Sequence, residues 1–247
     1  MESKGQVMQD FQNVARELAP VFPTHSRWNG LTAASTSALM RTATMINLNC
    51  GDQVNSGLGV LISGVLSVEK ELSDGRRALC VLFHEGDLVD LRRTERARQG
   101  NLIAIKESEF LALDEDQTAA CIAKCPDIAD MFIAEFGEHL ARMRDHVTDI
   151  AFKTPLECLA SVLFEFRRWP GVRLGVLQSG AFRVPISRGN IADYIGVKPE
   201  TVSRAIRQLE REGLIDIPEP DQVLITNIPA MRCLANGGRP RQSTRKN

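Results

Sequence analysis

One segment near the C-terminus constrains the fold of this chain more than any other. Residues 187–213 read SRGNIADYIGVKPETVSRAIRQLEREG and place two short helical patterns around a tight turn. Ser187 is a favourable N-cap, because its hydroxyl can accept a hydrogen bond from a backbone N–H of the first turn. Gly196 suits the left-handed conformation that ends many helices, and Pro199 suits the first position of a new helix, where its missing N–H is not needed. The segment therefore predicts a helix-turn-helix.

The second helix of this pair is predicted to have one apolar and one polar face. It runs from Pro199 to about Glu212, with Gly213 as its stop. At about 100° per residue, the apolar stripe consists of Val202, Ala205, Ile206 and Leu209, and the opposite sector of Glu200, Ser203, Arg204, Arg207 and Arg211. Arginine can donate two bonds to guanine and glutamate can accept one from cytosine, so the polar face suits readout of the DNA major groove. An ordinary solvated helix would also carry a polar face, but the preceding helix and the turn favour readout.

Two β-rich runs follow Gly213 in the segment LIDIPEPDQVLITN, separated by a proline-containing turn at 218–222. This pattern predicts a β-hairpin beside the second helix, which is the wing of a winged helix. We therefore expect a winged-helix DNA-binding domain over residues 153–235, followed by a flexible basic tail over 236–247.

The net charge of −1 conceals an uneven distribution. Residues 1–151 hold 15 Lys and Arg against 22 Asp and Glu, a charge of −7, and residues 152–247 hold 15 against 9, a charge of +6. The basic part contains the predicted helix-turn-helix, as attraction to a phosphate backbone requires. The charge distribution therefore supports double-stranded DNA as a partner.

The N-terminal half has a different sequence pattern. Short β-rich runs punctuated by glycine extend from about residue 43 to 113, and Asp74 and Gly75 form a hairpin signal between two of them. Many short strands of this kind predict a small antiparallel barrel or roll. We expect an N-terminal extension over residues 1–30 and a sensor-like β-roll over 31–125.

A long helix is predicted over residues 126–152, because apolar residues recur there at intervals of three and four. A stripe of this length is usually buried against a domain core or against its own copy in a dimer. We favour a homodimer, because helix-turn-helix proteins commonly read two half-sites through a two-fold axis. The residues expected at the dimer interface are Phe132, Phe136, Leu140, Met143, Val147 and Ile150.

Catalysis and metal binding have little support in the sequence. The six cysteines make no CxxC pair, no P-loop is present, and the four histidines lie on different segments without metal-ligand spacing. We therefore expect neither an enzyme nor a metal or cofactor, and we expect His139 and His146 at surface positions near the dimer seam. No segment approaches the roughly 18 apolar residues of a membrane span, and no signal peptide pattern is present, so we expect a cytoplasmic protein without membrane contact.

The order of β-roll, long helix and winged helix resembles the Crp/Fnr superfamily of bacterial transcription regulators over about residues 31–235. Within the helix-turn-helix, residues 200–204 look like the E-x-x-S-R reading motif of the Fnr and FixK branch. The resemblance implies an α+β fold and a homodimer on a palindrome of TTGA-type half-sites, with Glu200, Ser203 and Arg204 touching bases. It also implies RNA polymerase as a partner. The other DNA contacts that we expect are Ser187, Arg188, Lys198, Thr201 and Arg207.

Two departures from the family bear on the signal that this chain senses. The oxygen sensors of the family carry an N-terminal cysteine cluster for iron and sulfur, whereas the first cysteine here is Cys50. Cyclic-nucleotide receptors carry a Gly-Glu pair for the ribose and an Arg-Ser or Arg-Thr pair for the phosphate, whereas this chain has Gly86-Asp87 and Arg98-Gln99. We therefore expect neither an iron-sulfur cluster nor the usual cAMP site.

One cluster of positive charge leaves a second function open. Its members are Arg92, Arg93, Arg96 and Arg98. They could receive a small anion, or they could form a solvated, salt-bridged loop. The alternative function is an effector-gated receptor of the same family that responds to such an anion or to a redox signal.

Overall fold

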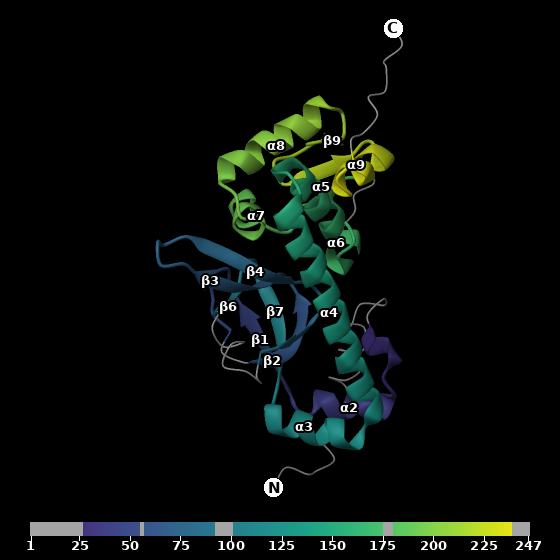
Figure 1. Cartoon of the computed structure of the whole chain (residues 1–247). Helices are drawn as coiled ribbons and strands as arrows, with labels where there is room; N and C mark the ends of the chain where they lie inside the picture. The colour runs from purple at the N-terminus through teal and green to yellow at the C-terminus, as the bar shows by residue number, and fades with distance from the viewer. Residues whose placement is uncertain (1–26, 55–56, 92–100, 175–179, 239–247) are drawn as a thin grey trace. The chain divides into compact units, whose positions relative to one another are not determined.

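The structure is a computed structural model, and it describes residues 27–54, 57–91, 101–174 and 180–238 (Figure 1). By its internal contacts the chain divides into two units. The first comprises Met1–Val68 and Leu82–Ala141, and the second comprises Glu69–Val81 and Arg142–Asn247. Among the described residues, no helix combines the length and the apolar character that crossing a bilayer would need.

The strands of the N-terminal half form two antiparallel sheets, as the β-roll prediction requires. The larger has the order β1-β7-β2-β5, from β1 (Ala43–Leu48), β7 (Ser108–Leu113), β2 (Leu58–Ser63) and β5 (Leu88–Asp90). The smaller has the order β4-β3-β6, from β4 (Arg77–Phe83), β3 (Leu66–Glu71) and β6 (Asn101–Ala104). Gly64 joins β2 to β3 at a φ of 92°, and a Cβ there would overlap Ser108 Oγ, so only glycine fits this corner.

The core of the first unit lies between the larger sheet and a set of helices. These are η1 (Arg27–Gly30), α2 (Ala33–Met40), α3 (Glu115–Lys124) and the first part of α4 (Pro126–Phe152). The buried cluster consists of Trp28, Leu39, Leu58, Val60, Ile62, Leu88, Leu111, Leu113, Ile128, Met131 and Phe132. Trp28 also donates its Nε1–H to the carbonyl oxygen of Gly86 at 2.8 Å. The expected N-terminal extension over 1–30 therefore includes a residue of the core.

The second unit has a helical core with a small antiparallel sheet. Its elements are α5 (Pro155–Phe166), α6 (Pro170–Leu174), β8 (Phe182–Arg183), α7 (Arg188–Ile195), α8 (Pro199–Arg211), β9 (Ile215–Asp216), β10 (Gln222–Ile225) and α9 (Ile228–Ala235). Thr154 and Glu157 form a reciprocal capping box at the start of α5. β9 and β10 pair as the predicted wing, and β8 adds a third strand that the sequence did not predict.

The long helix α4 has the bounds predicted from the sequence and runs for 27 residues. Its first turns carry Ile128, Met131 and Phe132, which are buried in the first unit. Further along, apolar side chains remain exposed, and these include Leu140, which is 66 % exposed. The N-terminal end of the helix therefore packs in the core of the first unit, and the rest of the helix exposes apolar residues to solvent.

Candidate nucleic-acid interface

The first helix of the helix-turn-helix begins and ends at the predicted residues. Ser187 Oγ accepts the backbone N–H of Asn190 at 3.1 Å and so caps α7. Gly196 ends the helix in the left-handed conformation, with φ 72° and ψ 33°. Pro199 is then the first residue of α8, as expected. The local sequence therefore sets the turn between the two helices.

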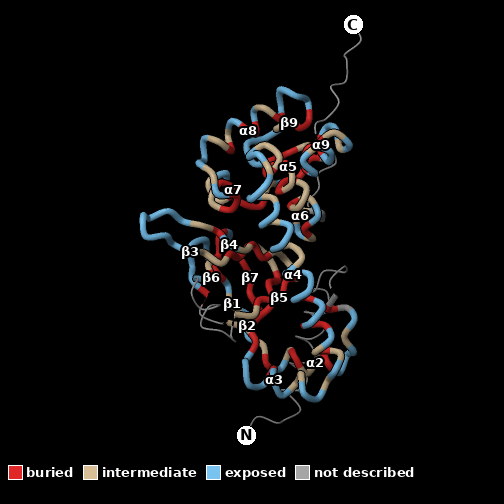
Figure 2. The backbone as a smooth tube through the Cα atoms, in the orientation of Figure 1, coloured by how far each residue is buried: buried red, intermediate tan, exposed pale blue. Residues whose placement is uncertain are grey.

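The two faces of α8 differ as the sequence predicted (Figure 2). Its apolar side packs against α5 and α7, and the buried residues are Val202, Ala205, Ile206 and Leu209. On the polar side, Glu200, Arg204, Arg207 and Arg211 are exposed, and Thr201 and Ser203 are half-buried. Burial of one side orients the helix, so the other side is held outward as a rigid surface.

Positive charge gathers on this exposed side. Arg204, Arg207 and Arg211 line a shallow, open hollow with Glu210. The guanidinium groups of Arg204 and Arg207 make no hydrogen bond or ion pair with any residue that the structure describes. Their donors are therefore available to acceptors such as a phosphate oxygen or the O6 and N7 atoms of guanine.

The remaining predicted contacts lie at the starts of the two helices. Arg188 is exposed in the first turn of α7, next to the cap residue Ser187. Lys198 is exposed at the N-cap of α8, where its side chain makes no capping bond. Backbone N–H groups at helix starts favour anions, so both positions suit phosphate contacts.

Arg77 is a contact to the helix-turn-helix that the sequence did not reveal. Within the second unit it donates from Nε to Asp193 Oδ2 at 2.9 Å and from Nη2 to Asn190 Oδ1 at 2.6 Å. It also pairs with Glu69 at 3.3 Å, on the neighbouring strand of the same hairpin. Because Asn190 and Asp193 both belong to α7, this guanidinium fixes the side of α7 that carries them.

Five of the six residues predicted for the dimer interface are exposed. Their exposed fractions lie between 42 and 66 %, and they are Phe136, Leu140, Met143, Val147 and Ile150. The expectation for Phe132 is wrong, because its ring is 5 % exposed and belongs to the core of the first unit. Ile133 and Phe152, which we did not predict, are also exposed on this helix.

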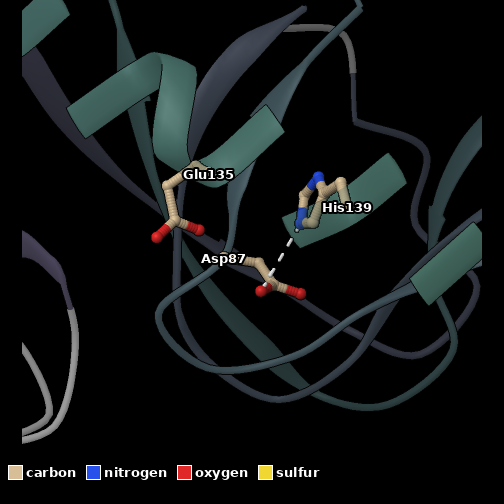
Figure 3. Close-up of side chains that lie close together, drawn as sticks. All are labelled: Asp87, Glu135 and His139. Atoms are coloured by element: carbon tan, nitrogen blue, oxygen red, sulfur yellow. Dashed lines mark ion pairs between the residues drawn. The ribbon is translucent and has the colours of Figure 1, made fainter. Parts of the chain in front are cut away.

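The structure also corrects the expectation for the two histidines of α4. The side chain of His139 is 13 % exposed and lies beside Asp87 and Glu135 (Figure 3). His146 is half-buried and stacks on Tyr194. Neither is an open surface position. The arginines predicted as an effector site, Arg92, Arg93, Arg96 and Arg98, lie outside the described residues.

Comparisons with known proteins agree with this geometry. Residues 159–234 match the family of Crp-like helix-turn-helix domains. The nitrogen fixation regulation protein FixK of Azorhizobium caulinodans is 30 % identical over 183 residues, which are 74 % of this chain and 73 % of that protein. The chain belongs to the Crp/Fnr family.

Further Crp/Fnr proteins support this assignment. FixK of Rhizobium meliloti is 32 % identical over 178 residues, or 70 % of this chain and 76 % of that protein. The structure of FixK2 from Bradyrhizobium japonicum has the same fold, with a TM-score of 0.69 at 24 % identity over 78 % of this chain and 96 % of that one. As a Crp/Fnr protein of the FixK branch, the chain is a DNA-binding transcription regulator and not an enzyme.

Proposed function

We propose that this Crp/Fnr regulator acts as a homodimer on a palindrome of TTGA-type half-sites. The observation that carries this proposal is the exposed polar side of α8, where Arg204 and Arg207 have donors available to a ligand. We infer the TTGA half-site from the similarity of residues 200–204 to the E-x-x-S-R motif. The protein would work in the cytoplasm with RNA polymerase as its partner.

The base contacts follow from the chemistry of three side chains. Arg204 donates two bonds to O6 and N7 of the guanine in TTGA. Glu200 accepts from the amino group of the cytosine in the complementary strand, and Ser203 contacts a neighbouring base. All three lie on the first two turns of α8, which is the part of a recognition helix that enters the major groove.

The phosphate contacts come from the rim of this surface. Lys198, Arg188 and Arg207 are exposed cations, and Ser187 and Thr201 add hydroxyl groups. Contacts of this type hold the protein in register on the duplex without reading sequence. They also make the affinity fall as salt concentration rises, because binding releases counterions from the DNA.

The exposed apolar residues of α4 supply the dimer interface. Phe136, Leu140 and Val147 lie within a narrow sector of the helix at about 100° per residue, and an apolar stripe of this length is a mark of an interaction surface. A two-fold axis along this stripe would place two copies of α8 on half-sites whose centres are about 10 base pairs apart.

A binding competition tests this function. Fluorescence anisotropy would measure the affinity for a labelled duplex with TTGA and TCAA arms, against a duplex of the same composition with scrambled arms. We expect at least a roughly thousandfold preference for the palindrome, and affinity that falls steeply with salt for both duplexes. Equal affinity for the two duplexes would contradict the proposal, since phosphate contacts alone do not discriminate sequence.

A further inference from the structure

Two acidic side chains and a histidine converge inside the first unit. Asp87 lies in the turn that joins β4 to β5, and Glu135 and His139 lie one helical turn apart on the same side of α4 (Figure 3). One potential ligand atom from each residue lies within 4.8 Å of those of the other two. Three metal-ligating groups therefore meet at one point.

The cluster is buried, and its spacing suits a bound ion. Asp87 is 4 % and Glu135 is 6 % exposed. His139 Nε2 is buried without a hydrogen-bond partner among the described residues, at 3.5 Å from Asp87 Oδ1. A good N–H···O bond is shorter, at about 2.7 to 3.2 Å. Two ligands of one transition metal, each bonded at about 2.0 to 2.2 Å, lie about 3.0 to 3.5 Å apart.

Neighbouring groups hold these ligands in place. The backbone N–H of His84 donates to Asp87 Oδ2 at 2.9 Å, so Oδ1 is the oxygen that faces His139. The edge-to-face contact of His139 with Phe83, at 5.2 Å between ring centroids, fixes the imidazole plane. Such supporting contacts orient ligands before a metal arrives.

His84 lies beside Asp87 but does not belong to the group of three ligand residues. Its Nε2 lies 3.8 Å from Asp87 Oδ1, and its Nδ1 lies 3.0 Å from the carbonyl oxygen of Glu85. Because a carbonyl oxygen only accepts hydrogen bonds, Nδ1 carries a proton.

We propose that Asp87, Glu135 and His139 bind one divalent first-row transition metal ion. The imidazole nitrogen of His139 favours Zn²⁺, Fe²⁺ or a similar ion over Mg²⁺ and Ca²⁺, which prefer oxygen ligands. No thiolate belongs to the described cluster, so a thiolate-bound ion is not expected. The ion would link the turn at 84–87 to α4.

Titration calorimetry with Zn²⁺ on chelator-treated, full-length protein tests this site. We expect one Zn²⁺ per chain in the wild type, at least tenfold weaker binding in His139→Ala and in Glu135→Gln, and no comparable binding of Mg²⁺. Glu138→Gln is the matched control, because Glu138 is exposed on the same helix. Zn²⁺ should also raise the melting temperature of the wild type and of the control, but not of the two ligand variants.

Cobalt substitution keeps the test decisive if the ligand variants fold poorly. Co²⁺ bound to wild-type protein should give a visible spectrum of nitrogen and oxygen ligation without a thiolate charge-transfer band, and binding should release protons. A thiolate band would place the ion on cysteines and overturn the proposal. Absence of Zn²⁺ binding would also overturn it.

Discussion

His146 stacks face to face on Tyr194, with ring centroids 3.8 Å apart and ring planes 5° apart. Both residues belong to the second unit, where His146 lies in the last part of α4 and Tyr194 lies in α7. Burial lowers the pKa of His146 below the ordinary histidine value, while the charge of Asp149 and a hydrogen bond with the Tyr194 backbone act in the opposite direction. The stack therefore favours a neutral imidazole.

This lowered pKa predicts that acid weakens the second unit. The unfolded chain takes up a proton on His146 first, so the stabilisation is full above the unfolded pKa of about 6.5 and declines as the pH falls below it. Denaturant unfolding at about pH 7.5 and about pH 5.5 would measure this loss. In His146→Phe, which retains an aromatic ring but cannot titrate, the loss should be smaller. Identical pH dependence in both proteins would refute the prediction.

Arg204→Ala should lower the affinity for the preferred palindrome by about 1 to 3 kcal/mol per half-site and relax the choice at one guanine. The reason is the loss of a bidentate contact from the polar side of α8. Binding isotherms on the palindrome and on duplexes with that guanine replaced would measure both effects.

Arg232→Ala is the matched control for Arg204→Ala, because Arg232 is an exposed arginine on α9 in the same unit. Its removal should leave the base preference intact. If folded Arg204→Ala protein kept full discrimination at every base pair, Arg204 would not be a reading residue.

Leu140→Glu and Met143→Glu should each shift the protein from dimer to monomer and weaken DNA binding, because a charge would enter an apolar interface. Analytical ultracentrifugation measures the mass in solution. Asp145→Lys is the control, since Asp145 is exposed and lies about 140° around the helix from Leu140 at about 100° per residue. A tight-binding monomer would show that α4 is not the dimer interface.

Addition of cAMP should leave the DNA affinity unchanged. The resemblance to the cyclic-nucleotide receptors implies a ribose-binding glutamate after Gly86, but Asp87 follows it here, and its buried side chain accepts the backbone N–H of His84. It is therefore not positioned to accept ribose hydroxyl groups. Footprinting with and without saturating cAMP measures the effect, and protection seen only with cAMP would contradict this interpretation.

The helix-turn-helix was predictable because its signals are local. Ser187, Gly196 and Pro199 fix the ends of two helices through backbone hydrogen bonds and dihedral angles, and neither depends on distant residues. The apolar stripe of α8 was predictable for the same reason, since a helix this amphipathic buries one side in almost any context.

Periodicity alone did not predict which residues of α4 are buried in the core and which are exposed. Phe132 and Phe136 both fit the apolar pattern, yet only Phe136 is exposed, because the pattern does not say which part of a stripe meets the core of its own chain. Glu135 and His139 are four residues apart in the sequence, but we did not interpret this as metal-ligand spacing. The proximity of Asp87 to these two residues was not predictable, because it arises from the tertiary packing of the turn between β4 and β5.

Selection of bound sequences from a pool of random duplex DNA tests the central claim most directly, because it presupposes no site. The purified full-length protein should enrich a two-fold symmetric sequence with TTGA and TCAA arms whose centres lie about 10 base pairs apart. Enrichment of a single unsymmetrical element, or of no sequence at all, would contradict the account of a homodimer that reads DNA through Glu200, Ser203 and Arg204.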